Sequence, residues 1–271
     1  MISHIESLPN TVTDSIKEFI SQKQIPTSPL IRDDIFNILE KYCTVLYFPL
    51  KNEENDGCHV QRFVNNQVEN FVYINTHKSI EKQIFTAAHE LGHILELNLF
   101  LKDHCPDYNT ELEETAMNQF AALVLMPDEI FLSQVKNNFT KYSTESDTIT
   151  FENLIKLSVC IMDYFFVPFK SVVIKLYETR FLSKDDAEKV INNQNTLEKI
   201  NDYIKLLGYK RLGIRSEKKS IRDFAVLLDK AEKNGSFSET KIKSIREKMD
   251  LPKLDETSLF GMLKFSDSKT E

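Results

Sequence analysis

Apolar and polar residues alternate with a helical period at the start of the chain. In the segments 11–22 and 31–43, apolar side chains recur every three or four residues. In the second segment Ile35, Ile38 and Leu39 share one face. The pattern therefore predicts two helices before the first strand.

The next stretch changes to short segments rich in β-branched and aromatic residues. Three such segments are separated by Asn, Asp and Gly: TVLYFPL (44–50), CHVQRFV (58–64) and ENFVYIN (69–75). The sequence NNQ at 65–67 is typical of a tight hairpin turn. These features predict a small three-stranded, mostly antiparallel sheet.

Beyond the third strand the pattern is helical almost throughout. Ser79 can cap a helix whose apolar stripe runs for about five turns to Leu99, and another helix is expected over 111–126. Pro168 and the sequence SKDD at 183–186 predict the starts of two further helices. A few strands followed by many helices indicate the α+β fold class.

The texture of the sequence changes near residue 194, with more charge and shorter apolar runs. Within this later part, residues 218–233 and 238–250 predict a helical hairpin, with Gly235 between its helices. We therefore expect an α+β domain over 1–193 and a helical C-terminal segment over 194–271 that recognises a partner or controls access to a site.

The charge balance argues against nucleic acid as the main partner. The formal net charge is -7 at pH 7, so a nucleic acid would be repelled unless a local basic surface outweighed that field. The densest basic cluster consists of Lys210, Arg211, Arg215, Lys218, Lys219 and Arg222. Acidic residues interrupt it, and no Gly-rich phosphate loop is present. A protein or peptide is the expected partner, and the oligomeric state stays open.

Composition also sets an expectation for the compartment. The start of the chain shows no signal-peptide pattern, and no run of about 18 apolar residues occurs that would span a membrane. The four cysteines lie far apart without a CxxC pair, which is too sparse for a secreted disulfide framework. We expect a cytoplasmic protein with reduced cysteines that does not act in a membrane.

The sequence HELGH at 89–93 carries the clearest chemistry. On a helix His89 and His93 project from one face, one turn apart, at a spacing that lets both imidazoles reach one tetrahedral zinc ion. Glu90 can reach a zinc-bound water, whose pKa is lowered to about 7, and act as general base. The alternative is a helix with two partly buried histidines that hydrogen-bond to backbone.

A third ligand is available at the start of the following helix. Glu111, Glu113 and Glu114 lie there, and a carboxylate from an antiparallel helix could fold back onto the histidines. The apolar positions of that helix leave Glu113 and Glu114 near its buried face and point Glu111 away. Asn118 lies one turn after Glu114 and could orient a ligand histidine, which favours Glu114 over Glu113.

Several other polar residues are weaker candidates for this chemistry. His59, His77 and His104 fit surface or hydrogen-bonded histidines better than ligands, although His77 precedes the motif helix. Tyr73 could present a phenol to an oxyanion, but core packing fits it as well. Cys58, in GCHV, could be a third ligand in place of a carboxylate, as in peptide deformylases, could occupy the open zinc position, or could be a small apolar residue on a strand.

Two quoted segments resemble one protein family. FTAAHELGHIL (85–95) and ETAMNQFAALVLMP (114–127) are similar to the ImmA/IrrE family of zinc metallopeptidases, with its HELGH, ExxAN and LLMP patterns. Met117 stands where the family usually has Ala, Val124 replaces a Leu, and Pro168 replaces a Ser in a later similar segment. The resemblance covers residues 10–180.

The resemblance implies a zincin-like metallopeptidase domain over 1–193, with one zinc ion held by His89, His93 and Glu114. Family members are cytoplasmic endopeptidases that cleave a helix-turn-helix repressor, often encoded nearby, and so derepress mobile-element, phage-defence or stress genes. The same role is implied here. Two alternatives remain at this stage: a zincin-like module that sequesters a regulator without cutting it, and a deformylase-like hydrolase that depends on Cys58.

Overall fold

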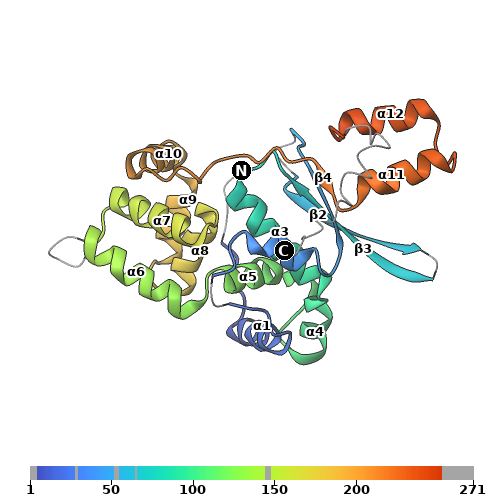
Figure 1. Ribbon diagram of the computed structural model, residues 1–271. Coiled ribbons are helices and arrows are strands. Elements are labelled where there is room, and N and C mark those ends of the chain that lie inside the picture. Colours follow the sequence, from blue (N-terminus) through green and yellow to red (C-terminus); the bar gives the residue numbers. More distant parts are fainter. Residues whose placement is uncertain (1–4, 28–29, 52–54, 65, 144–147, 252–271) are drawn as a thin grey trace, which may run out of the picture. The chain divides into compact units, whose positions relative to one another are not determined.

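The computed structural model describes residues 5–27, 30–51, 55–64, 66–143 and 148–251, and its chain divides into two compact units, Met1–Lys218 and Lys219–Glu271 (Figure 1). The first unit contains three of the strands and most of the helices. The second contains a helical pair.

The strands form a mixed sheet. Its strands are β1 (Thr44–Phe48), β2 (Gly57–Val64), β3 (Gln67–Asn75) and the two-residue β4 (Ser220–Ile221), in the order β2-β3-β1-β4. The strands β2 and β3 pair antiparallel, with Val64 opposite Gln67, whereas β1 runs parallel to β3, with Thr44 opposite Phe71.

The expected hairpin between the second and third strands is confirmed by the antiparallel pairing of β2 with β3 and by the positive φ of 62° at Asn66, while residue 65 of the expected turn lies outside the described residues. The expected three-stranded, mostly antiparallel sheet is wrong in strand number and in the direction of β1. A turn sequence specifies only the pairing of the two strands that it joins. The partner of β1 lies far along the chain, so packing decides its direction.

Helix α3 (Ile80–Ile94) lies at the centre of the first unit. It contacts β2, β3, α2 (Asp34–Leu39) and α5 (Glu113–Leu125), and α5 contacts α1 (Asn10–Gln22). The apolar face of α3, including Ile84, Ala88 and Leu91, is fully buried. The helix is therefore held on several sides, and its remaining polar face can be positioned accurately.

The motif helix is shorter than the apolar stripe predicts. Glu96 adopts a left-handed conformation with φ 62°, and the chain starts a new helix, α4 (Leu97–His104). The turn buries Leu97 and Leu101 completely, whereas Leu99, which the stripe had included, is 50% exposed. The single five-turn helix is therefore wrong: the chain turns at Glu96, and the new helix places Leu97 and Leu101 in the core.

The rest of the first unit is a helical layer. It contains α6 (Asp128–Tyr142), α7 (Phe151–Phe165), α8 (Phe169–Glu178), α9 (Lys184–Asn192) and α10 (Thr196–Leu207). The expected helix starts at Pro168 and Ser183 are confirmed, and Ser183 accepts a hydrogen bond from the Asp186 amide. Across the described residues no helix alone is long and apolar enough to cross a membrane, and only the pair α7 and α8, bent by 106°, passes that test jointly.

The second unit contains the expected helical hairpin, α11 (Phe224–Lys233) and α12 (Glu239–Lys248). The first helix begins later than residue 218, because Asp223 has a positive φ of 56° that a helix does not admit. Leu228 and Ile242 are buried. Arg246 pairs with Asp229 and Glu232 within the hairpin.

Candidate metal centre

Helices α3 and α5 approach closely at the motif. A Cβ added to Gly92 would lie 2.8 Å from Sδ of Met117 and 3.1 Å from the ring of Phe120. The glycine of HELGH therefore lets α5 pack directly on α3, which brings the start of α5 beside the two histidines.

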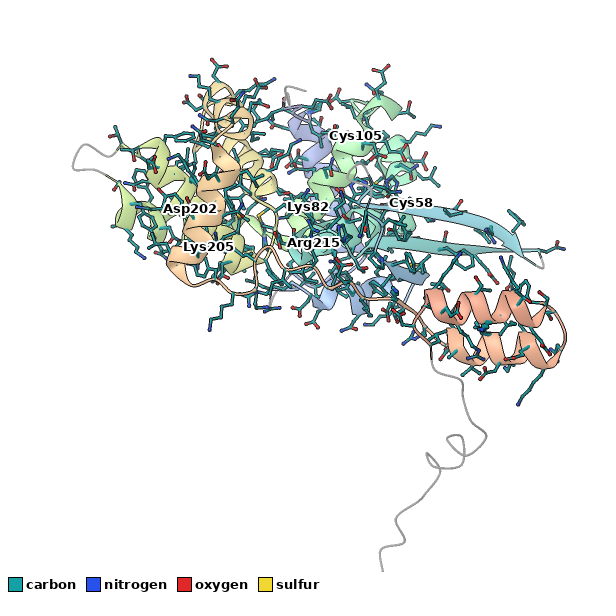
Figure 2. All side chains as sticks on the ribbon, turned by 90° about the horizontal axis from the view of Figure 1, so that it is seen from above. Cys58, Lys82, Cys105, Asp202, Lys205 and Arg215 are labelled. Carbon is teal, nitrogen blue, oxygen red and sulfur yellow. The ribbon has the colours of Figure 1, made fainter. Side chains whose placement is uncertain are left out.

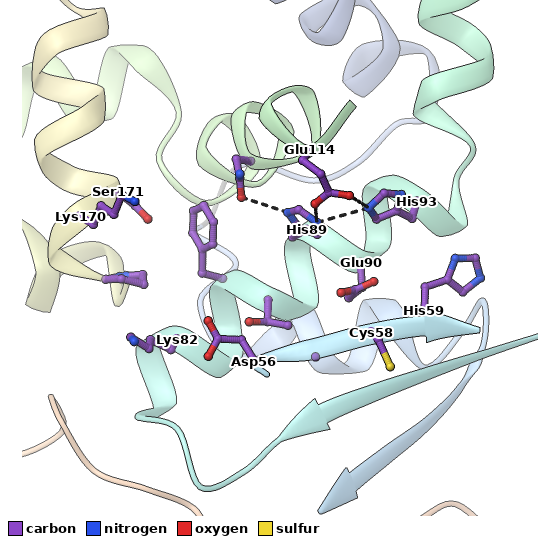
Figure 3. A pocket seen from close by; sticks show the side chains of 15 residues that line it. Asp56, Cys58, His59, Lys82, His89, Glu90, His93, Glu114, Lys170 and Ser171 are labelled. Atoms are coloured by element: carbon purple, nitrogen blue, oxygen red, sulfur yellow. Dashed lines mark hydrogen bonds and ion pairs between the residues drawn. The ribbon is translucent and has the colours of Figure 1, made fainter. Parts of the chain in front are cut away.

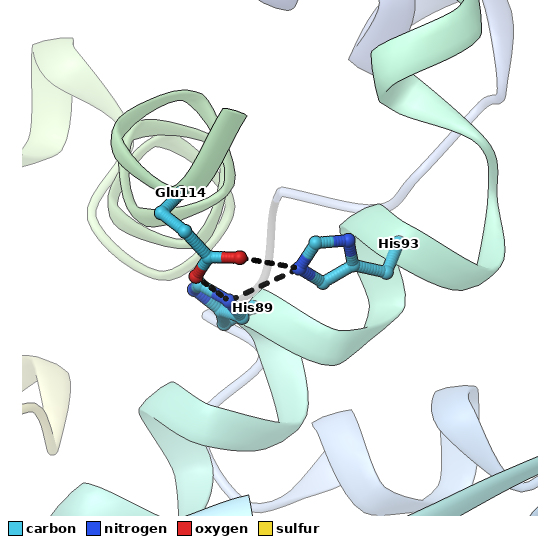
Figure 4. Close-up of side chains that lie close together, drawn as sticks. All are labelled: His89, His93 and Glu114. Atoms are coloured by element: carbon cyan, nitrogen blue, oxygen red, sulfur yellow. Dashed lines mark hydrogen bonds and ion pairs between the residues drawn. The ribbon is translucent and has the colours of Figure 1, made fainter. Parts of the chain in front are cut away.

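Three ligand-type side chains converge where the helices meet. His89, His93 and Glu114 each offer one atom, and these atoms lie within 4.8 Å of one another. Nε2 of His89 lies 3.3 Å from Oε2 of Glu114 and 3.3 Å from Nε2 of His93. Figure 4 draws the three side chains facing one another, with dashed lines for these contacts. The histidine side chains are 15% and 18% exposed and Glu114 is 75% exposed, so the cluster is open on the Glu114 side.

Both histidines present Nε2 to the cluster because their other ring nitrogens face polar groups of α5. Nδ1 of His89 lies 3.0 Å from Oδ1 of Asn118, and Nδ1 of His93 lies 3.6 Å from Oε1 of Glu113. A proton on Nδ1 leaves the Nε2 lone pair free for a metal. Glu113 therefore lies on the outer side of His93, and Glu114 on the side where the two Nε2 atoms meet.

Burial favours the neutral form of both rings. It lowers the pKa of His89, against the opposing effects of Glu114 and Asn118. Burial also lowers the pKa of His93, and the neighbouring His89 lowers it further. Neutral imidazole is the form that binds a metal ion.

Glu90 is a buried carboxylate beside this cluster. It is 6% exposed, and burial together with the negative charge of Glu114 raises its pKa to about 7. Within the described residues it makes no hydrogen bond or ion pair. A carboxylate with a pKa near 7 can both accept and return a proton at neutral pH.

The cluster lines the wall of a cavity of about 810 Å³, drawn in Figure 3. Its opposite wall is the start of β2, where a Cβ on Gly57 would lie 2.5 Å from Cγ2 of Thr86 and 2.7 Å from the carbonyl oxygen of Tyr73. This position admits only glycine, and the strand can therefore lie directly over Glu90. Lys82 and Lys170 add positive charge to the lining.

Two residues considered from the sequence, Cys58 and His59, lie in the cavity wall, although the sequence favoured a surface or hydrogen-bonded role for His59. Cys58 is exposed on β2 and lines the cavity, and His59 lines it too, with its ring centroid 6.5 Å from that of His93. Nε2 of His59 lies 2.9 Å from Oδ1 of Asn70. Their position directly after Gly57 was the available signal. Among the described residues, Cys58 belongs to no group of three ligand atoms.

Other weighed residues lie elsewhere. The Tyr73 phenol donates to the carbonyl oxygen of Phe48, and Nδ1 of His77 lies 2.6 Å from Glu217. His104 stacks on a neighbouring phenylalanine ring. Neither Tyr73, His77, His104 nor Glu111 lines the cavity that contains the cluster.

Most residues of the basic cluster contact acidic, aromatic or histidine side chains, so they do not form a continuous unpaired basic surface. The cluster occupies the segment between α10 and α11, where Arg211 faces Asp33 and Arg215 bonds Nε2 of His77 at 2.9 Å. Lys218 lies over the Tyr47 ring, and Lys219 pairs with Asp250 at 2.6 Å. The geometry adds no support for a nucleic-acid partner.

The donor set suits a zinc ion. Two neutral imidazole nitrogens and one carboxylate oxygen are the ligands of a catalytic zinc site with one open position. The open side at Glu114 and the adjoining cavity leave room for water and substrate.

Comparison with known proteins adds one finding. Residues 40–177 match a peptidase family model described as IrrE N-terminal-like domain, and this match spans half of the chain, from the start of the sheet through α8. No curated protein matches the chain.

Proposed function

The chain belongs to the IrrE N-terminal-like peptidase family, and from this premise we propose that it is a zinc-dependent endopeptidase that cuts a specific protein partner. The observation that carries the proposal is the convergence of His89, His93 and Glu114 within 4.8 Å, with Glu90 buried beside them. His89, His93 and Glu114 are the proposed ligands of one zinc ion.

Glu90 is the proposed general base. When bound, zinc would supply Lewis-acid activation of a water molecule and of the scissile carbonyl. One carboxylate oxygen of Glu90 accepts the proton of the attacking water and returns it to the leaving amine. Asn118 holds Nδ1 of His89, so that Nε2 stays directed at the cluster.

The proposed substrate is a protein, and within the family resemblance a helix-turn-helix repressor encoded nearby. Cleavage would derepress mobile-element, phage-defence or stress genes. The cavity of about 810 Å³ has room for a peptide segment, and its lining carries both lysines and acidic side chains, Lys82, Lys170 and Asp56 among them. A cytoplasmic setting is proposed, supported by four cysteines that are all free.

The first experiment measures bound metal in the purified protein and in variants. We expect about one zinc per chain in the wild type and in Glu90→Gln, and strong loss of zinc in His89→Ala and Glu114→Ala. Glu111→Ala is the matched control, because Glu111 lies in the same turn region but outside the cluster. A wild-type protein that binds no zinc would overturn the proposal.

The second experiment incubates the zinc protein with the neighbouring repressor and resolves fragments on a gel. Removal of a general base lowers the rate by about 10²–10⁴-fold, which is the effect expected for Glu90→Gln. A stable complex without fragments would favour sequestration instead. Loss of zinc in Cys58→Ser with zinc kept in Glu114→Ala would favour the deformylase-like alternative.

A further inference from the structure

A second cavity lies in the first unit and shares no lining residue with the metal cavity. Its volume is about 310 Å³, at the lower end of the range for small-molecule sites, so it admits a metabolite rather than a folded partner. The polar side chains that line it include Arg32, Gln134, Asn138, Asp163, Tyr209 and Arg211. They come from α6, the end of α7 and the segments before α2 and after α10.

Arg32 is anchored at the C-terminal end of α7. Its Nε and Nη2 donate to the carbonyl oxygen of Tyr164 at 3.0 and 2.6 Å. This carbonyl lies in the last turn of the helix, where it lacks a helical donor. A guanidinium has five N–H groups, so Arg32 keeps donors that can face the cavity.

Arg211 supplies a second guanidinium from a different segment. It stacks over the ring of Phe166, with Cζ 4.3 Å from the ring centroid. Its ion pair with Asp33 is long, at 3.4 Å, and both side chains are more than half exposed. Such a pair holds the guanidinium weakly, and a ligand carboxylate could replace it at small cost.

Asp163 contributes a carboxylate to the same cavity. In the part of the chain that the structure describes, it has no hydrogen bond and no ion pair, although Arg32 and Arg211 are close enough to affect it electrostatically. Burial raises the pKa of Asp163, and the two arginines oppose that effect. Opposite charges thus line one cavity without neutralising each other by direct contact.

The thiol at the base of the cavity is already engaged. Cys160 is 8% exposed, accepts a hydrogen bond from the phenol of Tyr209 at 3.4 Å and contacts that of Tyr142 at 3.5 Å. Nδ2 of Asn138 donates to the carbonyl oxygen of Gln134, which leaves its amide oxygen as an acceptor. The cavity therefore offers charge and hydrogen bonds rather than a nucleophile.

We propose that this cavity binds a small zwitterion of the α-amino acid class. The ligand carboxylate pairs with the guanidinium groups of Arg32 and Arg211, whose planar forks match a carboxylate. The ligand ammonium pairs with Asp163. A simple anion leaves Asp163 without a partner and a simple amine leaves both arginines without one, so only a ligand with both charges satisfies the whole set.

The experiment measures thermal shift and calorimetric binding with the full chain and each of the common amino acids at millimolar concentration. The matched probes are acetate, inorganic phosphate and a simple primary amine. We expect at least one amino acid to bind and to raise Tm. The three probes, each of which carries charge of one sign only, should neither bind nor raise Tm. Asp163→Asn and Arg211→Gln should each weaken binding about tenfold or more, because each removes a charged hydrogen-bond partner.

Asp202→Asn and Lys205→Gln are the matched controls, because they make the same kinds of change on exposed positions of α10 (Figure 2). Both should bind like the wild type. The proposal is overturned if no amino acid binds, if acetate or phosphate binds as well as the amino acid does, or if binding survives in both cavity variants. Arg211 is largely exposed, so its variant remains a test even if Asp163→Asn fails to fold.

Discussion

Two carboxylates have pKa values shifted in opposite directions: Glu90, in the middle of α3, and Asp128, at the start of α6. Burial and Glu114 raise the pKa of Glu90 in the metal cavity to about 7. Burial also acts to raise the pKa of Asp128, the first residue of α6, but Lys175 and Lys17 outweigh it and the pKa is lowered. Burial alone therefore does not decide the charge of a carboxylate; a fixed cation beside it does.

The difference between the regions lies in what each carboxylate faces. Asp128 accepts a hydrogen bond from Nζ of Lys175 at 2.6 Å, and Lys175 is 1% exposed inside the helical layer. Glu90 faces a cavity and two neutral histidines and has no cation of the described chain beside it. The first arrangement stabilises helix packing, whereas the second leaves Glu90 able to take up a proton near neutral pH, beside the place where a metal ion is proposed to bind.

The largest expected effect is on the paired carboxylate. In Asp128→Asn, Lys175 remains buried but loses its charged partner, so the free energy of unfolding should fall. The expected fall is about 3 kcal/mol, the low end of what breaking a buried ion pair costs, because Asp128 is 37% exposed. Urea unfolding at neutral pH measures this. Glu129→Gln, an exposed change in the same turn, should alter it by less than about 0.5 kcal/mol. An equal loss of unfolding free energy in Asp128→Asn and Glu129→Gln would contradict the stabilising role of the Asp128–Lys175 pair.

Glu90, which has no ion-pair partner among the described residues, should make the metal-free protein less stable as the pH rises. The folded pKa of Glu90 is raised, so the folded metal-free protein binds a proton that the unfolded chain has released, and stability falls as pH rises from about 5 to 8. In metal-free Glu90→Gln, the fall in the free energy of unfolding between these pH values should be smaller by roughly 2 kcal/mol. Urea unfolding of both proteins at the two pH values measures the difference, and the histidines, present in both, cancel. Identical pH dependence would show that Glu90 is not desolvated.

A smaller effect is expected for the residue that orients His89. Asn118→Ala removes the partner of Nδ1, so zinc affinity should fall by about 10–100-fold with the ligands intact. Competition with a chromogenic chelator measures the affinity, and Thr115→Ala on the same helix is the control. Unchanged affinity in Asn118→Ala would mean that helix packing alone orients the ring.

The smallest effect is expected at Glu113. Its Oε1 lies 3.6 Å from Nδ1 of His93, beyond hydrogen-bond distance, so Glu113→Gln should lower zinc affinity by less than about tenfold. The same competition assay applies. A loss as large as that of Glu114→Ala would assign Glu113 as the third ligand and revise the proposed site.

Much of the local structure was predictable because it depends on neighbouring residues. The hairpin at 65–67, the Ser183 cap and the helices that carry the motif follow from turn chemistry and periodicity. The break at Glu96 was not predictable in this way. The apolar stripe continues through it, and only the packing of Leu97 and Leu101 into the core shows where the helix must turn.

The sequence by itself determined that His89 and His93 share a helix face, because a spacing of four residues has that consequence in any α-helix. Helix periodicity left both Glu113 and Glu114 near the buried face, and the position of Asn118 favoured Glu114. The tertiary structure decided which of them lies nearest both Nε2 atoms, and it placed Cys58 and His59 on the opposite wall. These positions depend on contacts between segments far apart in the chain, such as the approach of α5 to Gly92, which local periodicity does not encode.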